Sequence, residues 1–174
     1  YPAGYYVSRI FVQASLKLPT DWGYGTALET QSRFDDGQVV FKETNFETLI
    51  DSPVYAGRYY KAYDLDPDAK TRVTLNVVAD RPELLNASDE VITIHRNLIQ
   101  QAYKLYGSLH YDHYDFLASF SDYLGRNGLE HHRSSENGLD PKYFTDWNTK
   151  YVGRDLLAHE FTHSRNGMFR RGVD

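Results

Sequence analysis

The 174-residue sequence contains no cysteine, and this absence excludes two kinds of stabilising site. Neither a disulfide framework nor a thiolate zinc site can form without cysteine. A bound metal ion would therefore need histidine and carboxylate ligands. The chain offers 7 histidines and 24 acidic residues for that purpose.

Runs of basic residues and long apolar runs are also absent. The net charge is −5, and phosphate binding requires clustered Lys and Arg, so we expect no nucleic-acid partner. No apolar run approaches the roughly 18 residues of a transmembrane helix, so we expect no membrane span. The sequence leaves the compartment open, with a periplasmic or secreted location favoured over a cytoplasmic one.

Aromatic residues are plentiful, with 15 Tyr and 9 Phe, and they favour β-structure in the first part of the chain. Segments 7–18, 38–41 and 55–63 combine β-forming residues with turn residues between them. Segment 72–78 alternates apolar and polar residues, which predicts a strand with one buried face. The tyrosines could form a sugar-binding platform, but cross-strand packing explains them more simply. Residues 1–80 are therefore expected to form an antiparallel, β-sandwich-like domain.

The hydrophobic period changes near residue 80, where we place a domain boundary. Apolar residues recur at steps of three and four from Val91 to Leu105, which predicts an amphipathic helix ending at Gly107. A strand is expected over 114–121, and the polar segment 134–142 is expected to be a loop. The predicted class is α+β, with a second unit over residues 81–174.

The most informative motif lies near the end of the chain, where residues 159–163 read His-Glu-Phe-Thr-His. On a helix, His159 and His163 lie one turn apart on the same face and can bind a single metal ion. Glu160 lies beside them, where it could take a proton from a metal-bound water. The motif therefore predicts a zinc site with Glu160 as general base.

The surrounding sequence supports a helix over 147–164. Val152, Leu156 and Leu157 supply apolar positions, and Asn166-Gly167 is a natural helix end. The alternative is a surface helix that carries two histidines by chance.

Two further motifs accompany this one: Gly128-Leu129-Glu130-His131 upstream, and Leu-Ile-Asp-Ser-Pro-Val over 49–54. With these motifs, most of the chain resembles the glycyl aminopeptidase family of zinc metallopeptidases. These enzymes are gluzincins with a thermolysin-like catalytic domain. The resemblance implies that the chain comprises a β-domain followed by the first half of such a catalytic domain.

The resemblance also implies roles for individual residues. His159 and His163 would be zinc ligands, Glu160 the general base, and Glu130 the residue that pairs with the α-amine of a peptide substrate. Gly128, Leu129 and His131 would line the substrate site with Glu130. The implied activity is removal of N-terminal glycine or another small residue.

Several roles stay open at this point. His131 and His132 could form a second metal site, donate to a transition state, or be polar loop residues. Asn166 could orient His163 or only cap the helix. The chain departs from the family pattern at Arg165 and at Gly172, which leaves the packing beyond the helix uncertain.

The third zinc ligand of a gluzincin is a glutamate on a later helix, which we expect beyond residue 174. The spacing excludes the metzincin class, and Asp174 as a ligand is disfavoured. We therefore expect the chain to be the N-terminal part of a longer enzyme, incomplete as a catalyst by itself. Its expected partners are the missing catalytic half, a C-terminal PDZ domain and, through exposed apolar surface, further copies of itself.

Two alternatives remain for the function. A zinc endopeptidase would use the same metal motif, with Glu130 incidental. A non-catalytic peptide- or glycan-binding module would use the Tyr-rich sheet, with an inert histidine helix.

Overall fold

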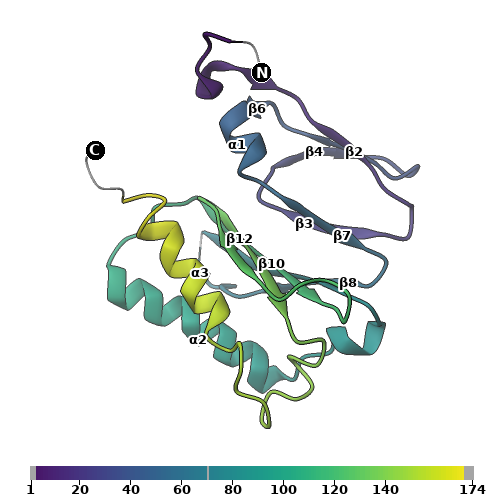
Figure 1. Ribbon diagram of the computed structural model, residues 1–174, viewed down its shortest axis with the longest axis vertical. Coiled ribbons are helices and arrows are strands. Elements are labelled where there is room, and N and C mark those ends of the chain that lie inside the picture. The colour runs from purple at the N-terminus through teal and green to yellow at the C-terminus, as the bar shows by residue number, and fades with distance from the viewer. Residues whose placement is uncertain (1–2, 70, 171–174) are drawn as a thin grey trace.

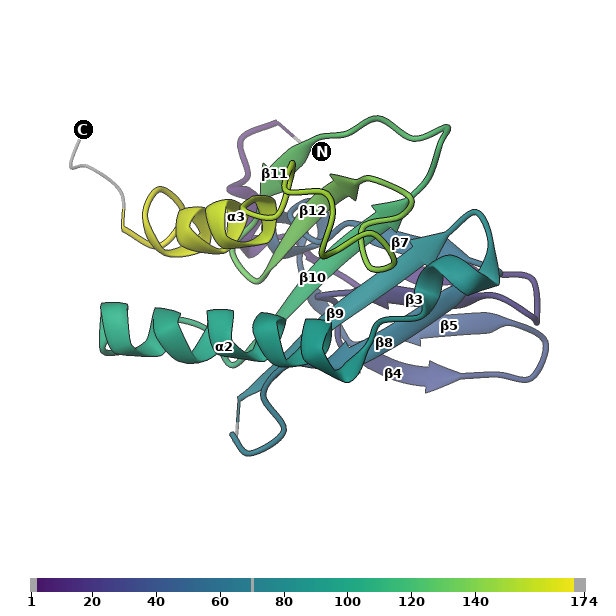
Figure 2. The same ribbon diagram turned by 90° about the horizontal axis from the view of Figure 1, so that it is seen from below.

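The computed structural model describes residues 3–69 and 71–170 of the chain. The largest sheet has five strands. Figures 1 and 2 show this sheet between two other layers. Helices α2 (Asp89–Tyr106) and α3 (Leu156–Arg165) lie on one side of the sheet, and strands of the N-terminal part lie on the other.

The N-terminal part consists of short antiparallel sheets. Its strands are β1 (Phe11–Val12), β2 (Ser15–Lys17), β3 (Gly23–Thr26), β4 (Thr30–Arg33), β5 (Gln38–Phe41), β6 (Thr44–Asn45) and β7 (Val54–Gly57). They pair as β1 with β6, β3 with β7, and β2-β5-β4. A 3-10 helix (Val7–Arg9) and the short helix α1 (Phe46–Ile50) complete this part. The strand expected at 38–41 is confirmed, whereas segment 7–18 is a 3-10 turn followed by two separate strands.

The central sheet consists of β8 (Tyr60–Asp64), β9 (Arg72–Ala79), β10 (His113–Phe120), β11 (Gly128–Glu130) and β12 (Ser134–Leu139). Their order is β11-β12-β10-β9-β8. β10 runs parallel to β9 and β12, while the two edge strands are antiparallel to their neighbours. Strands on both sides of residue 80 therefore share one sheet, and the division into two domains at that residue stays a prediction.

β9 differs from its prediction in having two buried faces. Val73, Leu75 and Val77 are fully buried, and the alternate residues Thr74 and Asn76 are buried as well. The physical reason is that β3 and β7 cover the face opposite the helices. The approach is close at Gly25, where an added Cβ would overlap the side chain of Asn76.

Helix α2 confirms the periodicity argument and its predicted end. The Ser88 side chain accepts a hydrogen bond from the Val91 N–H at the start, and Gly107 ends the helix with φ = 68°. The buried face contains Val91, Ile92, His95, Ile99 and Ala102. The prediction that Leu105 shares this face is wrong, because its side chain is 76% exposed in the last turn.

The prediction of a loop over 134–142 is wrong for the first six residues of that segment. They form β12, in which Ser134, Ser135 and Asn137 are completely buried. Asn137 Nδ2 donates to the carbonyl oxygen and the hydroxyl of Ser135, both at 3.0 Å. These bonds satisfy the Asn137 amide nitrogen, whereas Ser134 Oγ and Asn137 Oδ1 are buried without a hydrogen-bond partner among the described residues.

Helix α3 begins later than expected, at Leu156 instead of residue 147. Gly153 has φ = 82°, a left-handed conformation that interrupts any helix running into it. Val152 is consequently 86% exposed and takes no part in an apolar helix face. The end expected at Asn166-Gly167 is confirmed, with Asn166 as C-cap.

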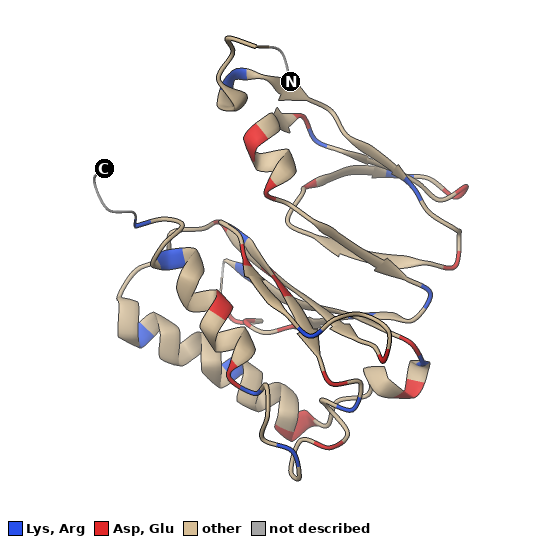
Figure 3. Ribbon diagram, viewed as in Figure 1, with Lys and Arg blue, Asp and Glu red and all other residues tan. Residues whose placement is uncertain are grey.

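The predicted α+β class is confirmed by these layers. Among the residues that the structure describes, no helix is both long and apolar enough to cross a membrane. Figure 3 shows Lys and Arg positions dispersed among Asp and Glu positions over all layers. The absence of a nucleic-acid partner stays a prediction.

Candidate metal centre and cleft

The core packing of α3 determines which way its histidines face. Leu157, Phe161 and Ser164 are buried against the central sheet at intervals of four and three residues. The helical period then places His159 and His163 together on a more exposed side. Backbone bonds at the start fix this register, because the His159 N–H donates to the Asp155 carbonyl at 2.8 Å.

The two imidazoles converge on one point. Their Nε2 atoms lie 3.0 Å apart, and their rings are nearly perpendicular at 77°. His159, Glu160 and His163 form the one group of three potential metal ligands found in the described ranges, with their ligand atoms within 4.8 Å of one another.

This arrangement fits a zinc ion on geometric and chemical grounds. Two nitrogens bound to one zinc at about 2.0–2.1 Å, with tetrahedral angles, lie about 3.3–3.4 Å apart. The observed 3.0 Å therefore needs only a few tenths of an ångström of opening. Neutral imidazole nitrogens and carboxylate oxygens are also donors that zinc prefers.

Glu160 lies on the inner edge of this group, with its side chain only 4% exposed. Burial raises the pKa of Glu160 above its usual value, and the negative charge of Glu130 adds to the rise. The two histidines act in the opposite direction, which burial outweighs. Glu160 is thus a carboxylate held in a partly dehydrated position beside the two imidazoles.

Strand β11 passes directly over Glu160. A Cβ added at Gly128 would overlap Glu160 Oε1 and would lie 2.8 Å from Leu156 Cδ1. Only glycine therefore fits at this point without moving the Glu160 side chain. Because side chains alternate along a strand, Glu130 lies on the same face of β11 as Gly128, and Leu129 lies on the other.

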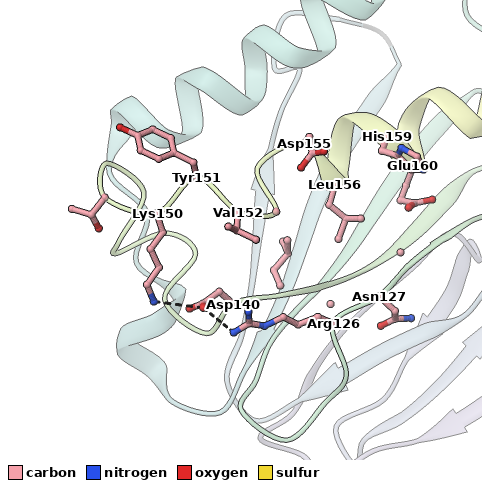
Figure 4. Close-up of a pocket in the computed structure, with 15 residues that line it drawn as sticks. Arg126, Asn127, Asp140, Lys150, Tyr151, Val152, Asp155, Leu156, His159 and Glu160 are labelled. Atoms are coloured by element: carbon pink, nitrogen blue, oxygen red, sulfur yellow. Dashed lines mark hydrogen bonds and ion pairs between the residues drawn. The ribbon is translucent and has the colours of Figure 1, made fainter.

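A cleft of about 730 Å³ begins at His159 and Glu160. Gly128 and Leu156 line the cleft near these residues, and the turn 149–153 forms its outer wall. Figure 4 shows Arg126 and Lys150 directed toward Asp140 at the far end, at 2.9 and 3.5 Å. A molecule in this cleft therefore has access to His159 and Glu160.

The predicted site residues do not all face this cleft. Gly128 lies against Glu160 and lines the cleft, whereas Glu130 is not among the lining residues and acts on Glu160 through its charge. Leu129 is 45% exposed on the opposite face of β11. His131 is buried, and both its ring nitrogens contact carboxylates, Asp51 at 3.0 Å and Glu136 at 3.1 Å. The roles of these residues toward substrate, and those of the metal ligands, stay predictions.

The structure describes two of the four other positions that the sequence singled out near the end of the chain. Arg165 is buried and donates to the carbonyl and hydroxyl oxygens of Ser108, so it closes the end of α3 against the loop after α2. Asn166 lies at the helix C-cap. Gly172 and Asp174 lie outside the described residues.

Sequence comparison finds a similarity to a known domain family over the first third of the chain. Residues 1–58 match the Peptidase M61 N-terminal domain. This segment includes the Leu-Ile-Asp-Ser-Pro-Val motif at 49–54. No functionally curated protein sequence matches the chain.

Solved structures share the fold over most of the chain. An aminopeptidase N family protein from Idiomarina loihiensis matches with a TM-score of 0.71 and 19% identity, over 91% of this chain and 28% of that one. An M1 zinc metallopeptidase from Deinococcus radiodurans matches with a TM-score of 0.54 and 9% identity, over 88% of this chain and 33% of that one. A two-domain M1 zinc metallopeptidase crystallised with L-arginine gives 0.53 and 8%, over 88% and 33%.

The chain therefore spans about a third of the length of these metallopeptidases. At these identities the likeness establishes a common fold. The chain thus has an N-terminal segment similar to the Peptidase M61 N-terminal domain, and it shares its fold with M1 zinc metallopeptidases.

Proposed function

We propose that this chain contributes the metal-binding and amine-binding parts of a zinc aminopeptidase. The observation that carries the proposal is the convergence of the His159 and His163 Nε2 atoms, 3.0 Å apart, beside a buried Glu160 at the end of a cleft. The similarity to zinc metallopeptidases in fold and in residues 1–58 supports it.

His159 and His163 would hold the zinc ion through their Nε2 atoms. Zinc in such a site lowers the pKa of water and polarises a substrate carbonyl. Glu160 would accept the proton from the attacking water and later deliver it to the leaving amine.

Glu130 would give the enzyme its preference for free N-termini. Its negative charge acts on Glu160, so the two carboxyl groups belong to one electrostatic site. A substrate ammonium group paired with Glu130 would have its first peptide bond next to Glu160. The following residues of the peptide would then occupy the cleft lined by Gly128 and Leu156.

A preference for glycine or another small N-terminal residue follows from the family resemblance. The second candidate function is a zinc endopeptidase, favoured by the length of the cleft beyond Glu160. In that case the peptide would continue past Glu130, and the carboxylate would have no ammonium partner.

Cleavage of paired peptides separates the two functions. A peptide with a free N-terminal glycine and its N-acetylated form are each incubated with the full-length, zinc-loaded enzyme that contains this chain. The value of kcat/KM is measured for both peptides. We expect the free amine to be cleaved about 100-fold faster or more, because acetylation removes the charge that Glu130 would bind. Equal rates would eliminate the aminopeptidase function and favour the endopeptidase.

A further inference from the structure

The hairpin between β11 and β12 is bound to the N-terminal part of the chain by a group of polar side chains, of which His131 is buried and the others are half-buried. Asp51 follows α1, and His131 follows directly after Glu130 at the end of β11. In sequence these two residues are 80 positions apart, yet His131 Nδ1 lies 3.0 Å from Asp51 Oδ1. Figure 1 shows α1 close to the end of the central sheet at which β12 begins.

Both ring nitrogens of His131 must donate hydrogen bonds. Nδ1 faces Asp51, and Nε2 lies 3.1 Å from Glu136 Oε1 on β12. A carboxylate is only an acceptor, so two such partners require the doubly protonated, cationic imidazole. Burial alone would lower the pKa of His131, but the bonds to Asp51 and Glu136 outweigh it and raise the pKa.

Asp51 also binds the hairpin through its second carboxylate oxygen, Oδ2. Oδ2 accepts hydrogen bonds from the backbone N–H of His132 at 3.0 Å and from its Nδ1 at 2.9 Å. Burial would raise the pKa of Asp51, but the hydrogen bonds from His131 and His132 more than compensate and lower it. Tyr55 on β7 completes the group, because its hydroxyl donates to Glu136 Oε2 at 3.2 Å.

The strand held in this way is an edge strand. Within the described part of the chain, β11 is paired only with β12, through registers that include Leu129–Glu136 and Glu130–Ser135. Edge strands have fewer constraints than central strands, so the position of Glu130 depends on what holds the two ends of β11. At one end Gly128 lies against Glu160, and at the other His131 is bound to Asp51.

We propose that Asp51 and His131 are positioning residues, which hold the β11–β12 hairpin so that Glu130 faces the α-amine of the substrate. The proposal rests on the proposed aminopeptidase function and adds a role for the N-terminal part of the chain. That part would position Glu130, and through it the first peptide bond of the substrate next to Glu160, without contacting the substrate itself.

A double-mutant cycle on the intact zinc-loaded protein tests the proposal. The four proteins are wild type, Asp51→Asn, Glu130→Gln and the double variant, and kcat/KM is measured on a glycyl peptide with a free amine. Because a displacement of about 1 Å can cost up to about 100-fold, we expect Asp51→Asn to lose about 10- to 100-fold. In the Glu130→Gln background the same change should cost less than about threefold, since it acts through Glu130.

Matched controls separate positioning from loss of structure. Glu47→Gln removes an exposed carboxylate from α1, and it should leave kcat/KM unchanged. Tyr55→Phe removes only the hydroxyl that donates to Glu136, and it should lower kcat/KM by a smaller factor than Asp51→Asn does. This variant tests the proposal even if Asp51→Asn folds poorly. Unchanged zinc affinity in all variants is expected, because no changed group is a proposed ligand.

The outcomes distinguish the two proposals. If Glu130→Gln cleaves as fast as wild type, the amine-binding function itself fails. If Glu130→Gln is impaired but Asp51→Asn and Tyr55→Phe are fully active, or if the losses multiply in the double variant, the positioning role is overturned while the aminopeptidase function stands.

Discussion

At the scale of single residues, the closest steric fit in the site is that of Gly128 against Glu160. A Cβ on residue 128 would overlap Glu160 Oε1 and come too close to Leu156 Cδ1. The Glu160 carboxyl is the far end of a flexible side chain, so it can move, but only away from its place beside the imidazoles.

Gly128→Ala should therefore impair turnover more than folding. We expect kcat to fall about tenfold or more, because the general base is displaced, and the unfolding free energy to fall by about 1–3 kcal/mol. Steady-state kinetics and urea denaturation measure the two effects. Gly125→Ala is the matched control, since its Cβ would meet no atom within 4 Å. A normal kcat in the Gly128→Ala variant would show that this contact has no catalytic importance.

At the scale of elements, the start of α3 decides which residues support the histidines. The structure places Leu157 in the core, 1% exposed, whereas Val152 precedes the helix in a turn and is 86% exposed. A helix beginning at 147 would instead include Val152, one turn before Leu156, in its apolar positions.

The two possible first residues of α3, Leu156 and residue 147, predict different stabilities for variants of Leu157 and Val152. Leu157→Ala should lower the unfolding free energy by about 2–5 kcal/mol, the cost of a core cavity, and Val152→Ser should change it by less than about 0.5 kcal/mol. Chemical denaturation of both variants provides the comparison. A loss of several kcal/mol for Val152→Ser would contradict the later start of the helix.

Sequence patterns predicted some elements well for identifiable physical reasons. α2 has a serine cap, an apolar period and a glycine end, all of which are local signals. β12 has no local signal, because Ser134, Ser135 and Asn137 read as loop residues and are buried through tertiary contacts of β12 with β10, β11 and α3. The start of α3 depends on the left-handed conformation of Gly153, which the residue permits but does not require.

At the scale of the whole molecule, the bond between Asp51 and His131 makes stability depend on pH. His131 has a pKa raised above 6.5, so its contribution is complete below pH 6.5 and is lost as the pH rises through the folded-state pKa. Asp51 has a pKa lowered below 3.8, so its contribution is complete above pH 3.8 and is lost as the pH falls through the folded-state value. Glu136 and His132 face the same group from β12 and from the hairpin.

The stabilisation should therefore be greatest between pH 3.8 and 6.5. We expect Asp51→Asn to lower the unfolding free energy by about 1.5–3 kcal/mol at about pH 5.5, as for hydrogen bonds between charged groups, and by less at about pH 9. Urea denaturation of wild type and variant at both values tests the difference. The same loss at both pH values would mean that the charge on His131 does not contribute.

The candidate site was predictable only in its local parts. His159, Glu160 and His163 form a continuous motif, so helix geometry alone brings them together. The placement of Glu130 near Glu160 required the family resemblance. The partners of His131 were not predicted, because Asp51 and Glu136 come from separate elements of the fold and no spacing rule connects them to residue 131.

The most direct measurement of the central claim is a calorimetric zinc titration of the intact protein and its variants. We predict one zinc site in wild type, its loss in His159→Ala and in His163→Ala, and its retention in Glu160→Gln, which keeps both imidazoles. Heats that are the same in wild type and in both histidine variants would contradict the account, because they would show that these two imidazoles hold no metal ion.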